Sequence, residues 1–187
     1  MNINTRVLGT LCIIGGAAYL INGLRFFVAG GPVTGLLEVV LSSIWAVGGI
    51  CGILGMLAAR VTGTNRVARI LSYLPVVAFL SALAGNVQRA LNPAVQFSPF
   101  IFFGLLGLVV GMLLVGVLTV LANVWKGWKK VVPFLPAVMP FIGMAIGAAI
   151  GIVGGVNVSL VALSWMLLGY SVVTSPAPVN AMVPTVA

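Results

Sequence analysis

Acidic and imidazole side chains are almost absent from this 187-residue sequence, which contains one acidic residue, Glu38, and no histidine. A Ser-His-Asp triad cannot be assembled without histidine, and paired-carboxylate acid–base chemistry needs a second acid. The residues that could ligate a metal reduce to Glu38, Cys12 and Cys51, which are too few for a closed metal site. We therefore expect a protein that is not an enzyme and that holds no metal.

Charge of either sign is scarce as well, since 5% of the residues are charged, whereas a soluble domain carries about 25%. Hydrophobic residues make up 61% of the chain, and the mean hydropathy is +1.27. So few charges cannot cover a water-soluble globule, and the composition predicts an all-α integral membrane protein. Most of the basic residues flank apolar segments, so the net charge of +8 indicates membrane topology and not a nucleic-acid partner.

Six segments are long and apolar enough to cross a bilayer as helices, which takes about 20 residues. They predict one transmembrane domain over residues 1–173, a compact bundle of three helical hairpins. The expected spans are residues 6–29, 33–59, 67–91, 98–124, 132–153 and 158–173. The last span is short, which leaves five spans as the alternative. Pro75 should kink the third span, and residues 174–187 should form an irregular tail.

The distribution of lysine and arginine predicts the orientation of the bundle. With six spans, the side of the N-terminus carries Arg6, Arg60, Arg66, Arg69, Lys126, Lys129 and Lys130, and the opposite side carries Arg25 and Arg89. This bias predicts a multi-pass protein of the cell (cytoplasmic) membrane with its N-terminus in the cytoplasm. The basic clusters should face anionic lipid headgroups on that side.

Glu38 is the most informative candidate for a functional residue. It lies about as far after the Gly30–Pro32 turn as Arg25 lies before it, so both should lie at one depth in the membrane. An unpaired charge at that depth is costly. We expect Glu38 either to pair with Arg25 or to be protonated, with Arg89 as a competing partner.

Amides and hydroxyls accompany these charges at helical spacing. Asn22 precedes Arg25 by three residues, and Asn86 precedes Arg89 by three. Ser42 follows Glu38 by four residues, so each pair shares a helix face. The predicted ligand or ion-pair site comprises Arg25, Glu38, Arg89, Asn22, Ser42 and Asn86. The alternative is that these groups hydrogen-bond between helices and bind no ligand.

Glycines recur every four residues in three of the expected spans. The first row comprises Gly143, Gly147 and Gly151 in the fifth span and Gly155 in the weak break just after it. The others are Gly107 and Gly111 in the fourth span and Gly48 and Gly52 in the second. Such rows let helix backbones approach closely. They predict helix packing, with the partner helix in the same chain, in a second copy or in a foreign subunit.

Two functional hypotheses follow. The first is a non-enzymatic scaffold or accessory subunit of a larger membrane complex, because the chemistry of catalysis is missing and the loops are short. The alternative is a small transporter, channel or ligand-capturing component with an outward-facing polar site around Arg25, Glu38 and Arg89. No cofactor motif is evident, although Tyr19, Trp45 and Trp165 at mid-membrane depth could touch a bound lipid, quinone or pigment.

Overall fold

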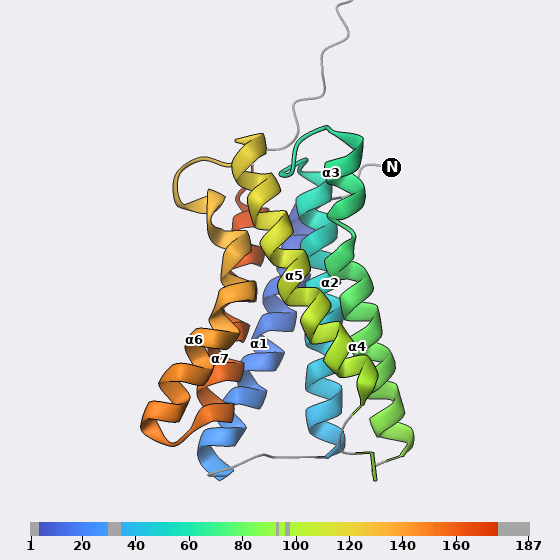
Figure 1. Cartoon of the computed structure of the whole chain (residues 1–187), viewed down its shortest axis with the longest axis vertical. Coiled ribbons are helices and arrows are strands. Elements are labelled where there is room, and N and C mark those ends of the chain that lie inside the picture. Colours follow the sequence, from blue (N-terminus) through green and yellow to red (C-terminus); the bar gives the residue numbers. More distant parts are fainter. Residues whose placement is uncertain (1–3, 30–34, 93, 96–97, 176–187) are drawn as a thin grey trace, which may run out of the picture.

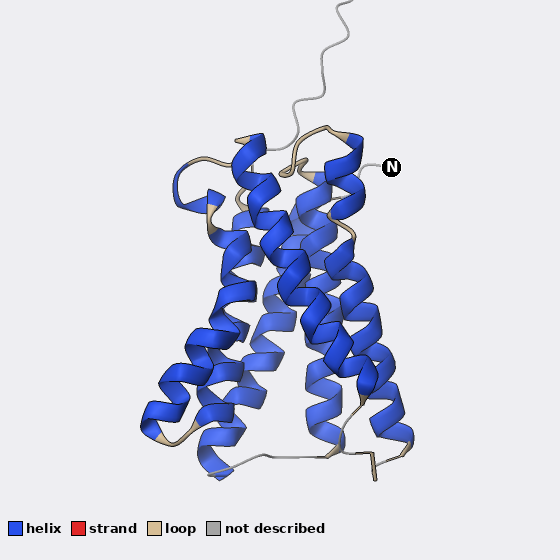
Figure 2. Cartoon of the chain, in the orientation of Figure 1, coloured by secondary structure: helices blue, strands red, loops and turns tan. Residues whose placement is uncertain are grey.

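The computed structural model describes residues 4–29, 35–92, 94–95 and 98–175. Within them, all regular elements are helices (Figure 2). Six helical segments are long and apolar enough to cross a membrane. The predicted all-α bundle of six spans is therefore confirmed. The predicted Gly30–Pro32 turn and residues 176–187 of the expected tail lie outside the described residues.

The helices follow the predicted spans closely, with differences near proline and glycine. They are α1 (Thr5–Ala29), α2 (Leu36–Ala58), α3 (Arg66–Leu71), α4 (Leu74–Leu91), α5 (Pro99–Ala122), the 3-10 turns η1 (Gly127–Lys130) and η2 (Val132–Phe134), α6 (Leu135–Ile150) and α7 (Val153–Val173). Pro75 does not kink a continuous helix. It lies in the first turn of α4, after a break at residues 72–73, where a missing N–H costs little.

The last span is longer than the sequence indicated. Gly151 has a φ of 78° and ends α6 in the left-handed conformation, which glycine adopts without steric cost. Gly154 and Gly155 therefore lie inside α7, which has 21 residues and is long enough to cross a bilayer. The five-span alternative does not hold.

The helices form two groups that meet at one end and diverge at the other (Figure 1). The first group contains α1, α6 and α7, and the second contains α2, α4 and α5. We call the end where α1 begins and α7 ends the proximal end, and the opposite end the distal end. α5 runs diagonally, so that Gly116 near its proximal end packs against Phe134 of η2 and Gly104 near its distal end packs against α4.

Close contacts between backbones join α1 to both of its neighbours. Gly15 of α1 faces Gly48 of α2, where an added Cβ would lie 2.8 Å from the Gly48 Cα. A second glycine row faces α7. Gly9, Gly16 and Gly23 recur every seven residues and pack against Gly169, Ala162 and Ser159. α1 therefore links the two groups of helices.

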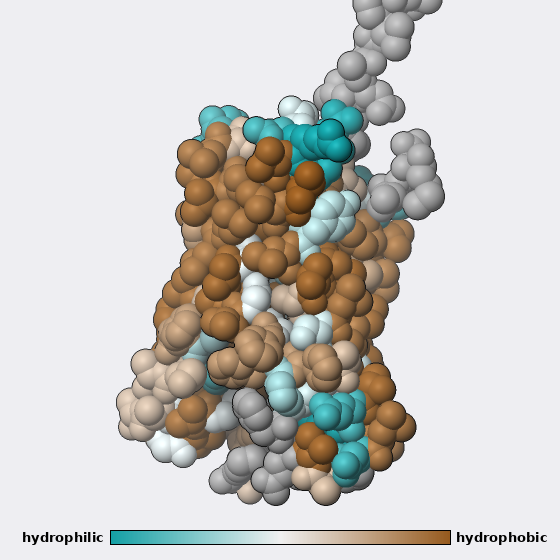
Figure 3. Space-filling view, turned by 45° about the vertical axis from the view of Figure 1, so that its right-hand side comes forward, coloured by the Kyte–Doolittle hydropathy of each residue, from teal (hydrophilic) through white to brown (hydrophobic). Residues whose placement is uncertain are grey.

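The molecular surface has the layering of a membrane protein. Figure 3 shows hydrophilic residues at the proximal end, a smaller hydrophilic patch near the distal end, and mainly hydrophobic surface between them. Large apolar side chains of the spanning helices are exposed, including Val77 of α4 and Phe141 of α6. Because apolar surface of this extent is stable in contact with lipid, the chain is a multi-pass membrane protein.

Candidate functional site

An ion pair between α2 and α4 is the central feature of the distal end. The Arg89 guanidinium donates to both carboxylate oxygens of Glu38, with N–O distances of 3.0 and 2.6 Å. The two side chains are 18% and 15% exposed, respectively. Glu38 lies in the first turn of α2 and Arg89 in the last turn of α4, so each charge also opposes the partial charge of its helix end. The bidentate geometry makes this contact a clamp between the two helices.

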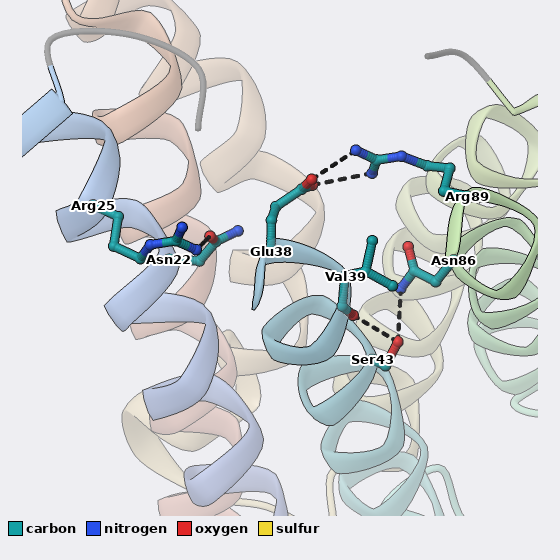
Figure 4. Close-up of polar contacts among 7 residues, drawn as sticks. All are labelled: Asn22, Arg25, Glu38, Val39, Ser43, Asn86 and Arg89. Carbon is teal, nitrogen blue, oxygen red and sulfur yellow. Dashed lines mark hydrogen bonds and ion pairs between the residues drawn. The ribbon is translucent and has the colours of Figure 1, made fainter. Parts of the chain in front are cut away.

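Arg25 is not the partner of Glu38, contrary to the first expectation from the sequence. Its guanidinium donates instead to the Asn22 side-chain oxygen on its own helix, at 3.4 Å. Figure 4 shows Glu38 directed from α2 toward Arg89, with Arg25 on the separate helix α1. The competing partner Arg89 therefore forms the pair. Equal depth along two helices does not determine the direction in which each side chain points. The packing of α2 against α4 directs Glu38 toward Arg89.

A second polar contact lies beside the clamp on the same pair of helices. The Asn86 side-chain amide donates to the Ser43 hydroxyl at 3.2 Å, and that hydroxyl donates to the Val39 carbonyl at 2.8 Å (Figure 4). Asn86 is buried. The sequence pattern selected Ser42 because it follows Glu38 by one helical turn. Among the described residues, Ser42 has no side-chain hydrogen bond, and its neighbour Ser43 makes the contact.

The predicted site is thus divided between two places. Glu38, Arg89 and Asn86 meet between α2 and α4, whereas Asn22 and Arg25 interact along α1. Asn22 is buried and Arg25 is half-buried. Arg25 also lines an open pocket of about 390 Å³ on α1, together with Ile21, Leu24, Val28 and Ala29.

An aromatic cluster joins the two groups of helices at mid-depth. The Tyr19 and Trp45 rings stack with centroids 4.3 Å apart, and Phe79 meets Trp45 and Trp165 edge-on at 5.2 and 5.0 Å. The sequence points to Tyr19, Trp45 and Trp165 but not to Phe79, because nothing in the local sequence of Phe79 distinguishes it from lipid-facing residues. The indole N–H groups of both tryptophans are buried and lack a hydrogen-bond partner within the described part of the chain.

The glycines named from the sequence differ in their surroundings. Gly48 and Gly52 face α1, Gly107 and Gly111 face α4, and Gly143 and Gly147 face the start of α7. Gly151 and Gly155 do not continue the α6 row, which corrects the prediction. Gly151 ends α6 with nothing within 4 Å of an added Cβ, and Gly155 belongs to α7, where it meets Phe27 of α1.

Histidine, cysteine, aspartate and glutamate do not gather in groups of three or more anywhere in the described residues, so no metal site is indicated there. The chain matches no protein-family model, no curated protein and no solved structure.

Proposed function

We propose that this chain is a non-enzymatic membrane protein that acts as a scaffold or accessory subunit of a larger membrane complex. The observation that carries the proposal is the state of Glu38, the only acidic side chain in the sequence. Both of its oxygens accept hydrogen bonds from Arg89, so the group that could best relay a proton or bind a cation instead holds two helices together. The clamp supports a role in architecture.

The proposal includes an orientation. The proximal end carries most of the basic residues, on the segments around α3 and η1 and at the start of α1. Because lysine and arginine are retained on the cytoplasmic side, we place this end and the N-terminus in the cytoplasm of a cell whose plasma membrane holds the protein. The partners are other membrane subunits or further copies of the chain.

Co-purification from native membranes tests this function. The full chain, tagged and expressed at its native level, is extracted with its surrounding lipid and analysed by quantitative mass spectrometry. A scaffold is recovered with one or more proteins, or as a homo-oligomer, at constant stoichiometry. The E38Q/R89Q variant, which replaces the ion pair by two amides, should retain the same partners. Recovery of the wild-type chain alone as a monomer would contradict the proposal.

A second candidate is a small transporter, channel or ligand-capturing component, favoured by the open pocket beside Arg25. In such a protein the distal polar residues would contact a solute directly. Reconstitution into proteoliposomes separates the candidates, because a Glu38-coupled mechanism requires E38Q/R89Q to abolish flux. Absence of flux in the wild type favours the scaffold, whereas flux that E38Q/R89Q leaves unchanged would contradict a Glu38-coupled mechanism.

A further inference from the structure

Arg25 is a cation for which no described residue supplies a counter-charge. The single acidic side chain of the sequence is bound by Arg89 through both of its oxygens. A guanidinium has five N–H donors. The one polar contact of Arg25 in the described chain is the 3.4 Å bond to Asn22, which is long for an N–H donor and an oxygen acceptor. Most of its donor capacity is therefore not used by any described residue.

The surroundings of Arg25 are apolar and open to the membrane. The pocket of about 390 Å³ that it lines has Ile21, Leu24, Val28 and Ala29 as its other lining residues. Ile21 is 52% exposed and Leu24 is 53% exposed. Arg25 precedes the end of α1 by four residues, or about 6 Å along the axis. The charge therefore lies near the boundary between lipid headgroups and acyl chains, directly beside a surface that acyl chains would cover.

We propose that this pocket binds an anionic phospholipid of the leaflet at the distal end. Its phosphate accepts hydrogen bonds from the Arg25 guanidinium, whose planar donors match phosphate oxygens. One acyl chain lies along Ile21, Leu24 and Val28. A zwitterionic headgroup fits less well, because its own cation would lie close to Arg25 and offset the attraction. The inference is independent of the scaffold role.

Site-resolved photocrosslinking tests the proposal on the full chain in nanodiscs. The probes are a phosphatidylglycerol and a phosphatidylcholine with identical diazirine-bearing acyl chains, and the readout is the crosslink yield on residues 21–28. The anionic probe should react about fivefold more, the factor that one basic side chain adds near an anionic surface. Equal yields from the two lipids on the wild-type chain would overturn the proposal.

Variants assign the effect to Arg25. R25Q should lower the anionic yield on residues 21–28 to that of phosphatidylcholine, whereas R66Q, which removes an exposed arginine at the proximal end, should leave it unchanged. R25K keeps the positive charge but lacks the planar guanidinium donors, and should give an intermediate yield. It therefore provides a second test if R25Q folds poorly. An unchanged yield in R25Q, or full competition by free inorganic phosphate, would show that a phospholipid headgroup is not what Arg25 binds.

Discussion

Glu38 and Arg89 owe their pairing to their positions on two antiparallel helices as much as to their opposite charges. A carboxylate in the first turn of α2 and a guanidinium in the last turn of α4 each oppose the terminal partial charge of their own helix. The same contact neutralises two charges at a depth where an isolated one is costly. The adjacent bond from Asn86 to Ser43 extends this polar seam.

Replacing the carboxylate alone should destabilise the protein. E38Q leaves the Arg89 charge mostly buried without a counter-charge, and we expect a loss of about 3 kcal/mol in the free energy of unfolding. The double variant E38Q/R89Q should recover at least half of that loss, because it removes the orphaned charge. Chemical denaturation in detergent micelles measures both. Equal stability of E38Q and the wild type would show that the clamp contributes nothing.

The sequence predicts which polar residues take part in these contacts better than it predicts which residue each of them contacts. Spacing along a helix places Asn86 beside Arg89 and gives Glu38 and Arg25 a common depth. It does not say that α2 turns Glu38 toward α4, which follows from packing between helices far apart in the sequence. For the same reason Ser42 and Ser43 cannot be ranked before the α2–α4 contact is known.

Helices in this bundle approach each other through glycine at the points of closest contact. Gly9, Gly16 and Gly23 keep one face of α1 against α7, as a seven-residue repeat does for helices that cross at a small angle. The seven-residue spacing of this row differs from the four-residue spacing that predicts the other glycine rows. The hydropathy pattern predicts the spans within a few residues, but it mistakes Gly154 and Gly155 for a loop, although small residues in membranes commonly mark packed helix faces.

Two glycines of the predicted α6 row should respond differently to alanine. An added Cβ at Gly143 would lie 2.6 Å from the Asn157 Cα, so α6 and α7 must separate. Gly151 has open space, and G151A should cost only the backbone strain of a positive φ, about 1–2 kcal/mol. We expect G143A to lower the melting temperature clearly more than G151A. The reverse order would contradict the packing of α6 on α7.

Gly48 and Gly107 form a second matched pair. A Cβ at Gly48 would lie 2.7 Å from the Gly15 Cα, a backbone atom that can move only with its helix. A Cβ at Gly107 would meet Ala78 alone, with the Ala78 Cβ at 3.2 Å and its Cα at 3.9 Å, so a shift of α5 from α4 by a few tenths of an ångström relieves the contact. Alanine at position 48 should therefore destabilise by more than about 2 kcal/mol, and at position 107 by less than about 1 kcal/mol. Thermal unfolding of the G48A and G107A variants, monitored by circular dichroism, compares the two effects. Equal effects would argue against a close α1–α2 crossing.

The two groups of helices are joined to each other more at the proximal end than at the distal end. There the segment between α5 and α6 is tied to the end of α7, because the Trp125 indole donates to Ser175 at 2.8 Å and Lys129 donates to the Thr174 carbonyl at 3.0 Å. At the distal end the two groups of helices diverge (Figure 1). The basic residues are concentrated at the proximal end, where the two groups of helices are joined. This distribution is consistent with a proximal end that lies at a charged headgroup layer.

A bundle of six spans places the two termini on one side of the membrane and the end of α4 on the other. Short tags at the N- and C-termini, and an impermeant thiol reagent acting on N92C at the exposed end of α4, report both sides in intact cells. The wild-type protein serves as the control for labelling of the native Cys12 and Cys51, which lie within membrane-spanning helices. We predict that both tags become accessible only after permeabilisation, whereas N92C reacts in intact cells. Tags on opposite faces of the membrane would rule out six spans, and N92C that reacts only after permeabilisation would rule out a cytoplasmic N-terminus.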